Sequence, residues 1–128
     1  MKPLQGLRIL VVEDADDVRE VYARLLEIEG ATVVAVSAGR EAVAQAIDGD
    51  FDILITDLGL PDIPGDEIIR RVRATARRPL WVVAITGYGE PHIGRAWQAG
   101  ADVVFTKPIL WSSLRDTVTS RRAVSRAA

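Results

Sequence analysis

Apolar and polar positions alternate in blocks along the chain, and the blocks predict strands and helices in strict alternation. Short runs of Val, Ile and Leu are typical of strands buried in a parallel sheet. Between these runs, apolar residues spaced three or four positions apart predict amphipathic helices. The expected strands are 8–12, 32–36, 53–57, 80–85 and 102–105, and the expected helices are 16–29, the segment between Ser37 and Gly49, 66–75, 91–99 and 112–122.

The first two helices carry the clearest patterns. Ser37 is the expected N-cap of the second helix, and Gly30 is the expected end of the first. The positions expected to face the core are Val18, Val21, Tyr22, Leu25 and Leu26 in the first helix and Ala42, Val43, Ala46 and Ile47 in the second.

Five strand–helix units in a row predict an α/β fold, a parallel sheet with helices on both faces and right-handed crossovers. The length of 128 residues fits one domain and is enough to bury a core. Neither a repeat nor a linker interrupts the pattern. We expect residues 1–128 to form a single domain with its core at about 7–120 and a frayed tail at 121–128.

The composition is that of an ordinary globular protein, with 48% apolar and 27% charged residues. The net charge of −2 gives no global field that would attract nucleic acid or a membrane surface. Cysteine is absent, which removes disulfides, thiol nucleophiles and cysteine-ligated metals and makes the cytoplasm the default compartment. Residues 1–6 lack the apolar core of a signal peptide, and no apolar stretch approaches the ~20 residues needed to cross a bilayer.

Polar side chains lie at or just beyond the ends of four of the predicted strands. Glu13 and Asp14 follow the first, Asp57 ends the third, Thr86 follows the fourth and Lys107 follows the fifth. In an open α/β sheet, ligands bind beyond the carboxyl ends of the strands. We therefore expect three carboxylates, a hydroxyl and an ammonium to converge on one site.

Such a cluster has a definite chemistry. Crowded carboxylates raise one another's pKa unless a cation relieves them, and oxygen ligands with retained waters suit Mg²⁺ best. A metal beside a carboxylate, with Lys107 and Thr86 opposite, is the arrangement expected of a phosphoryl-transfer site. In such a site one carboxylate attacks the phosphorus atom in line with the leaving group. Asp57 is the best nucleophile because it stands alone at the end of a central strand.

Each residue also has an ordinary structural interpretation. Asp14 and Asp16 could cap the helix that follows, where acids are common. Asp57 precedes a loop rich in Gly and Pro and could form a turn, as could Thr86 with Gly87. Because these polar residues occur together at four strand ends, the interpretation as one shared site is favoured over separate caps and turns.

Several short motifs give the arrangement a family resemblance that covers essentially the whole chain. Any one of them is weak, but their order and spacing are specific. They are the acidic pair Glu13-Asp14, Thr56-Asp57-Leu58, Leu60-Pro61-Asp62, Ala84-Ile85-Thr86-Gly87, Ala99-Gly100-Ala101-Asp102 and Thr106-Lys107-Pro108. With these motifs the chain resembles the receiver domain of two-component response regulators. The resemblance implies a flavodoxin-like, doubly wound sheet of strand order 2-1-3-4-5 in a three-layer sandwich with five helices.

The resemblance also implies roles for the site residues. Asp57 would be the phosphoacceptor, and Asp14 would bind Mg²⁺ directly while Glu13 reaches it through water. The backbone carbonyl of Gly59 would be a further metal ligand. Lys107 would pair with the Asp57 carboxylate and then with the phosphoryl oxygens.

The implied function is signalling rather than enzymatic turnover. Thr86 would hydrogen-bond the phosphoryl group and move towards it on activation. A histidine kinase or histidine phosphotransfer domain would be the partner, because the chain's one histidine, His92, is expected in solvent. The signal would repack the face built by the fourth helix, fifth strand and fifth helix. The chain either stands alone or is the receiver of a larger protein such as a hybrid sensor kinase. Its opening motif and its Thr-Gly-Tyr-Gly loop are more similar to hybrid-kinase receivers.

The sequence departs from the family pattern in three places. Val104 stands where the family usually has an aromatic switch residue, and Phe105 is no simple replacement because one step along a strand reverses the face. Pro64 stands where an aspartate is common, which stiffens that loop. Val103 and Ser113 replace expected acids, which argues against the dimer of winged-helix regulators and favours a monomer or weak dimer.

Two other functions share parts of the pattern. Haloacid-dehalogenase-type phosphatases also use a strand-end aspartate with Mg²⁺, but they need a second aspartate two residues later, where this chain has Gly59. A flavin-binding module of the same topology is disfavoured because three carboxylates would repel an FMN phosphate.

The arginines between positions 70 and 78 are expected to form a solvated helix face rather than a nucleic-acid site. The three tryptophans are expected to pack, with Trp97 and Trp111 flanking the signalling face.

Overall fold

The structure, a computed structural model, describes residues 2–87 and 89–127 and side chains as far as Arg121. Five parallel strands form one sheet in the order β2-β1-β3-β4-β5. The elements are β1 (Arg8–Val12), α1 (Asp16–Ile28), β2 (Thr32–Val36), α2 (Gly39–Asp48), β3 (Ile53–Asp57), α3 (Gly65–Thr75), β4 (Trp81–Thr86), α4 (His92–Ala99), β5 (Val103–Thr106) and α5 (Trp111–Ala127). The flavodoxin-like α/β fold and its strand order are confirmed.

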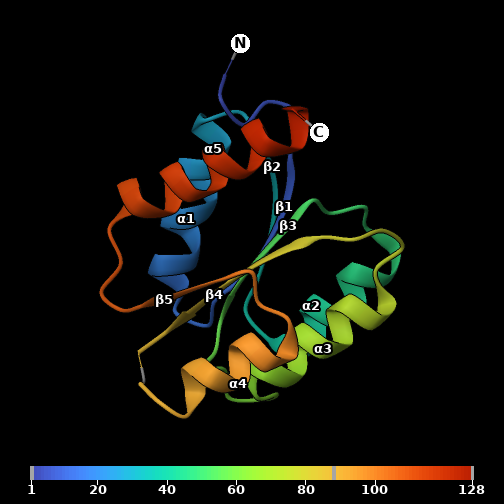
Figure 1. The fold of residues 1–128 in the computed structure, drawn as a ribbon, viewed down its shortest axis with the longest axis vertical. Coiled ribbons are helices and arrows are strands. Elements are labelled where there is room, and N and C mark those ends of the chain that lie inside the picture. The colour runs from blue at the N-terminus through green and yellow to red at the C-terminus, as the bar shows by residue number, and fades with distance from the viewer. Residues whose placement is uncertain (1, 88, 128) are drawn as a thin grey trace.

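The helices cover both faces of the sheet. Helices α1 and α5 lie on one face, and α2, α3 and α4 lie side by side on the other (Figure 1). Alternate residues of each strand point to opposite faces, so Leu10 and Val12 pack with α2, α3 and α4 while Ile9 and Val11 pack with α1 and α5. The central strand β3 is buried along its whole length. Its last residue, Asp57, is therefore held in a rigid setting.

Two inward positions predicted from the helical pattern are wrong. Val21 on α1 and Ile47 on α2 are about half exposed, at 51% and 49%. The stripe of each helix that contacts the sheet is narrower than the apolar pattern, and Leu26 is the only fully buried residue of α1. Apolar residues at the rim of a stripe remain in solvent, as they do on most protein surfaces.

Several element ends differ from the expectation. The last two strands end one residue later, so that Thr86 is the final residue of β4. Ser37 does not cap α2, because the helix begins one residue further on with Ala38 as its N-cap, and the Ser37 hydroxyl donates to Glu41 instead.

The last helix runs to Ala127 rather than ending near Arg122. The segment contains no Gly or Pro to stop it and several strong helix formers. Ala128 lies outside the described residues, and fraying of the tail stays a prediction. Within the part of the chain that the structure describes, no helix has the length and apolar character needed to span a bilayer.

Candidate functional site

The polar residues at the strand ends gather at one edge of the sheet. Backbone hydrogen bonds continue past the strands and fix these ends in register. The Glu13 N–H donates to the Val36 carbonyl at 3.1 Å, the Leu58 N–H to the Ile85 carbonyl at 3.0 Å and the Lys107 N–H to the Thr86 carbonyl at 2.7 Å. The side chains that follow β1, β3, β4 and β5 are thus placed by the most rigid part of the fold.

Three carboxylates meet at this edge. Oxygen atoms of Glu13, Asp14 and Asp57 all lie within 4.8 Å of one another. Glu13 and Asp57 are buried, at 4% and 7% exposure, whereas Asp14 is exposed to solvent. Hard oxygen donors this close together, with one of them open to water, fit a small divalent cation that retains part of its hydration shell. The donor set fits Mg²⁺.

The Asp57 carboxylate is held from both sides. The Lys107 Nζ lies 3.0 Å from Asp57 Oδ2, and the Gly59 N–H donates to Asp57 Oδ1 at 2.9 Å. The same Nζ lies 3.7 Å from Glu13 Oε1. One ammonium therefore faces two of the three carboxylates, and a charge imbalance remains at the site.

Burial and the neighbouring charges shift the pKa values of Glu13 and Lys107. Burial raises the pKa of Glu13 to about 7, and the neighbouring Asp57 and Asp14 carboxyls add to the rise, although a hydrogen bond from the Ala15 N–H opposes it. For Lys107, burial lowers the pKa, but the hydrogen bond with Asp57 and the charges of Asp57 and Glu13 outweigh it, so the net shift is upward. The site thus favours the protonated form of Glu13 and the charged form of Lys107.

The loop between β1 and α1 is fixed by a residue that the sequence patterns did not single out. Arg19 donates from Nη1 to the Glu13 carbonyl at 3.0 Å and from Nη2 to Asp16 Oδ1 at 2.7 Å. The N-cap of α1 is Ala15, which has no side-chain cap, so neither Asp14 nor Asp16 has the capping role that was the alternative interpretation. The spacing of Asp16 and Arg19 by three residues was the available signal.

The site opens into a hollow of about 540 Å³. Its lining combines site residues with apolar side chains from α1 and from the segment after β5, namely Glu13, Asp14, Ala15, Val18, Tyr22, Gly87, Lys107, Pro108 and Ile109. Burial raises the pKa of Tyr22, and the negative charge of Glu13 adds to this. The hollow connects Glu13, Asp14 and Lys107 with solvent.

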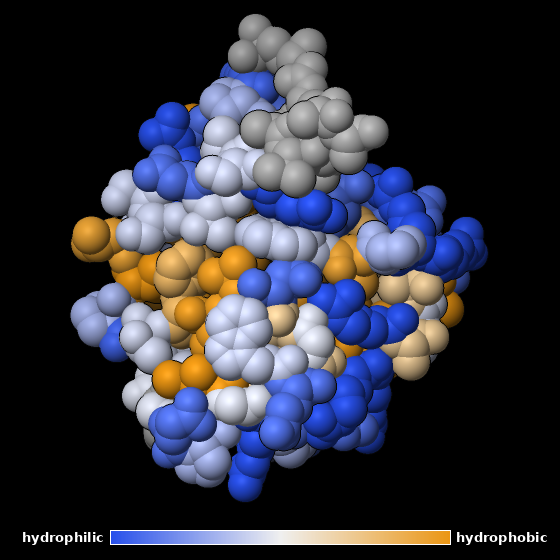
Figure 2. Space-filling model, viewed as in Figure 1, coloured by the Kyte–Doolittle hydropathy of each residue, from blue (hydrophilic) through white to orange (hydrophobic). Residues whose placement is uncertain are grey.

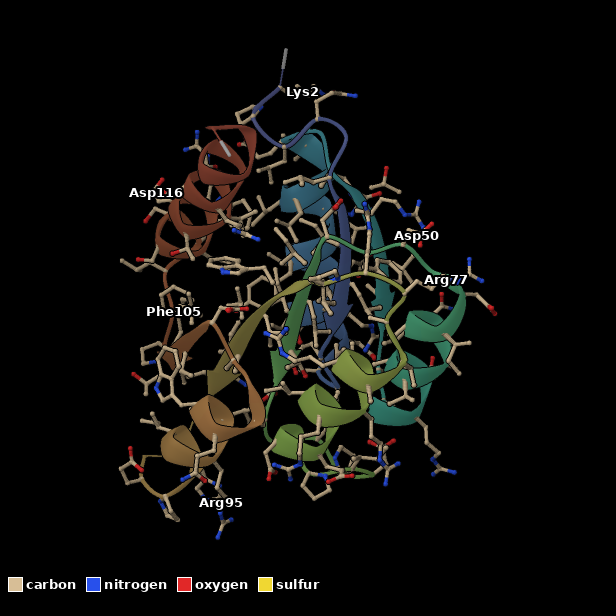
Figure 3. The ribbon with its side chains drawn as sticks, turned by 45° about the vertical axis from the view of Figure 1, so that its right-hand side comes forward. Lys2, Asp50, Arg77, Arg95, Phe105 and Asp116 are labelled. Atoms are coloured by element: carbon tan, nitrogen blue, oxygen red, sulfur yellow. The ribbon has the colours of Figure 1, made fainter. Side chains whose placement is uncertain are left out.

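Thr86 is fully buried at the end of β4. It directly follows Ile85, which is the register partner of Asp57. Val104 packs with the α2, α3 and α4 side of the core, and Phe105 packs with the α1 and α5 side. Figure 3 shows Phe105 at the margin of the sheet near α5. Phe105 therefore cannot occupy the place left by the missing aromatic at Val104.

The face between α4 and α5 is partly apolar. Figure 2 shows apolar side chains gathered there, over the edge strand β5. Trp97 on α4 is 49% exposed and Leu110, just before α5, is 72% exposed. Trp97 is thus more exposed than a packing residue, whereas Trp81 and Trp111 are partly buried against the core.

Four of the five arginines between positions 70 and 78 form ion pairs within the molecule. Ion pairs join Arg70 to Asp66 at 2.8 Å, Arg71 to Glu67 at 3.0 Å, Arg73 to Asp102 at 2.9 Å and Arg78 to Asp52 at 2.9 Å. Arg77 projects from the molecule near Asp50 (Figure 3). Paired guanidinium groups of this kind support the interpretation of a solvated helix face rather than a nucleic-acid surface.

Solved structures similar to this chain include receiver domains and response regulators. A receiver domain protein from Methanospirillum hungatei superposes with a TM-score of 0.85 at 26% identity, covering 92% of this chain and 93% of that one. A Burkholderia pseudomallei response regulator with a phosphorylated aspartic acid and a calcium ion has a TM-score of 0.80 at 25% identity, covering 95% of this chain and 74% of that one.

Sequence relatives lead to the same family. The chain is 39% identical over 126 residues to the transcriptional regulatory protein TcrA of Mycobacterium tuberculosis and 33% identical over 141 residues to the virulence sensor protein BvgS of Bordetella pertussis. These matches take in 96% and 99% of this chain but only 47% and 11% of the relatives. The family model for the response regulator receiver domain matches residues 9–119. The chain therefore belongs to the response regulator receiver domain family.

Proposed function

We propose that this chain is a phosphoacceptor whose Asp57 takes a phosphoryl group from the phosphohistidine of a histidine kinase or histidine phosphotransfer domain. The observation that carries the proposal is the convergence of three carboxylates within 4.8 Å, with the Lys107 ammonium 3.0 Å from the Asp57 carboxylate. The sensor protein BvgS and the sensory/regulatory protein RpfC are among the relatives, which supports a partner of the sensor class.

The residues that would hold Mg²⁺ are Glu13, Asp14, Asp57 and the backbone carbonyl of Gly59. When bound, the ion would neutralise oxygens of the incoming phosphoryl group. A relative from Thermotoga maritima, TrrA, was solved in complex with Mg²⁺-BeF at 27% identity and a TM-score of 0.78. The phosphorylated Burkholderia regulator contains a calcium ion. Both support a divalent cation at this site.

In the transfer step, an oxygen of Asp57 attacks phosphorus and forms a P–O bond. The P–N bond to the donor histidine breaks, and its electron pair stays on the imidazole nitrogen. Lys107 pairs with the carboxylate before the step and with phosphoryl oxygens after it. The product is an acyl phosphate that adds about −1.5 to −2 charge. Thr86 would hydrogen-bond this group and transmit its presence towards the α4–β5–α5 face.

The donor histidine is supplied from outside. His92, the chain's one histidine, is exposed at the start of α4. The chain thus acts as a cytoplasmic signalling module that catalyses only its own phosphorylation and dephosphorylation. It works alone as a monomer or weak dimer, or as the receiver of a larger regulator or hybrid sensor kinase.

The phosphatase alternative lacks its general acid. Two residues after Asp57, where such an enzyme places an aspartate, stands Gly59, whose N–H donates to Asp57. Without a carboxyl there, the acyl phosphate would persist rather than turn over.

Intact-mass measurement after incubation with Mg²⁺ and acetyl phosphate tests the proposal. We expect one phosphate adduct that is stable in acid, is cleaved by hydroxylamine and is lost when EDTA is added beforehand. The Asp57→Ala variant should give no adduct, while Asp52→Ala, a substitution outside the site, should behave like wild type. An adduct that survives Asp57→Ala would show that the acceptor is another residue.

A further inference from the structure

Helix α2 receives its N-terminal cap from a distant loop. Asp62, which lies between β3 and α3, accepts the Gly39 N–H on Oδ1 at 3.0 Å and the Arg40 N–H on Oδ2 at 2.9 Å. These are the first two amides of α2, and the residue before them, Ala38, has no side-chain cap to offer. The amides at a helix start need such acceptors, and here one carboxylate 22 residues away satisfies two of them.

The charge of Asp62 suits this place. The hydrogen bond from the Arg40 N–H, opposed by a smaller burial effect and joined by the Gly39 N–H, lowers the pKa of the Asp62 carboxyl. A carboxylate at a helix N-terminus also interacts favourably with the helix dipole. The cap therefore remains charged at neutral pH.

Apolar packing draws the same two segments together. A Cβ atom on Gly39 would lie 2.8 Å from Ile68 Cδ1 and 3.2 Å from Ile63 Cβ, so a larger residue there would push against both isoleucine side chains. Ile63 is buried beside Asp62, and Pro61 and Pro64 restrict the backbone on either side. The joint between α2 and this loop is thus tight in both its polar and its apolar contacts.

The other end of the loop is tied to the phosphoacceptor. The Gly59 N–H donates to Asp57 Oδ1 at 2.9 Å, and the Leu58 N–H donates to the Ile85 carbonyl at 3.0 Å. Residues 58–62 are therefore anchored at β3 on one side and at α2 on the other. The carbonyl of Gly59, a proposed metal ligand, lies between the two anchors.

We propose that Asp62 is a positioning residue for the metal site, which holds the Gly59 carbonyl in place by anchoring its loop to the start of α2. The inference rests on the proposed function, because it takes Gly59 as a ligand of Mg²⁺. Coupling between two sites is reciprocal. Occupancy of the metal site therefore secures the first turn of α2 in return.

The test compares Asp62→Ala and Asp62→Asn with Glu41→Gln as the matched control. Glu41 also lies in the first turn of α2, but its carboxylate accepts the Ser37 hydroxyl. Mg²⁺ is titrated into each protein while the amide signal of Gly59 is followed by NMR. Exchange of the Arg40 amide is measured with and without Mg²⁺.

We expect Asp62→Ala to weaken Mg²⁺ binding by about tenfold, the lower end of what loss of a partner behind a metal ligand costs. Asp62→Asn should recover part of the loss, because its amide oxygen still accepts one N–H, and Glu41→Gln should bind like wild type. Mg²⁺ should slow exchange of the Arg40 amide in wild type but much less in Asp62→Ala.

If both Asp62 variants bind Mg²⁺ within twofold of wild type, Asp62 caps α2 without positioning the site, and the inference is overturned. The isosteric Asp62→Asn keeps the test valid should Asp62→Ala fail to fold. Failure of the proposed function has a different signature, namely that wild type itself neither binds Mg²⁺ at Gly59 nor forms the Asp57 adduct.

Discussion

Removing the charge of Glu13 should stabilise the metal-free protein. Glu13 is buried beside Asp57, with its pKa raised from 4.5 to about 7 mainly by burial. In the unfolded chain the same carboxyl is solvated and titrates near 4.5. Between these two values the folded state holds the proton more tightly, so the contribution of Glu13 to the free energy of unfolding falls as pH rises. Its penalty is absent below about pH 4 and complete above about pH 8.

The size of the penalty follows from the shift. A pKa raised from 4.5 to about 7 corresponds, at about 1.4 kcal/mol per unit, to about 3 kcal/mol at pH 8 and about 1.4 kcal/mol at pH 5.5. Glutamine keeps the shape of the protonated form without titrating. Glu13→Gln should therefore raise the free energy of unfolding by these amounts and weaken Mg²⁺ binding at the same time. Proteins commonly lose some stability by burying charged residues that their functional sites need.

Urea unfolding in EDTA at pH 8 and pH 5.5 measures both values. Glu20→Gln is the matched control, because Glu20 is exposed on α1 and its loss should change stability by less than about 0.5 kcal/mol. The reasoning is refuted if Glu13→Gln destabilises the protein at pH 8, or if its stabilisation is no smaller at pH 5.5 than at pH 8.

Three further predictions concern the buried Leu54, the Lys107 ammonium and the hydrogen bonds of Arg73. Leu54→Ala in the buried strand β3 should lower the free energy of unfolding by about 2–5 kcal/mol, and a loss below 1 kcal/mol in urea unfolding would contradict the packing described. Lys107→Met should bind Mg²⁺ more tightly by calorimetry, because the ammonium no longer competes for the carboxylates, yet accept phosphate from acetyl phosphate more slowly; unchanged values of both would exclude its role. Arg73→Met should cost about 1–3 kcal/mol, since this guanidinium donates to the carbonyls of Gly100 and Leu80, whereas Arg70→Met, an exposed ion pair, should cost under about 1 kcal/mol.

The alternation of apolar blocks was sufficient to predict the strands, the helices and the layered fold. The spacing of apolar residues along a strand or along one side of a helix repeats every few residues. Such a repeat can be recognised in a short stretch of sequence. The gathering of Glu13, Asp57, Thr86 and Lys107 was predictable for a related reason. The carboxyl ends of parallel strands meet at one edge of the sheet, and each of these residues lies at such an end.

Local patterns were less reliable at the rims and ends of helices. Val21 and Ile47 fit the helical period yet are exposed, because the width of the contact between helix and sheet depends on how the layers are placed. Ser37 has the chemistry of an N-cap, but α2 takes its cap from Asp62. At the start of α2 the cap thus comes from a residue that is distant in the sequence.

The sequence by itself thus determined the order of elements, the sheet edge that bears the site and the residues placed there. Only the tertiary structure decided the state of those residues: how deeply Glu13 is buried, that Lys107 faces Asp57 and Glu13 together, and that Asp62 ties the Gly59 loop to α2. The physical reason is the distance along the chain over which each interaction acts. Hydrophobic periodicity acts over a few residues, whereas desolvation, ion pairing and capping between segments depend on groups that the fold brings together from far along the chain.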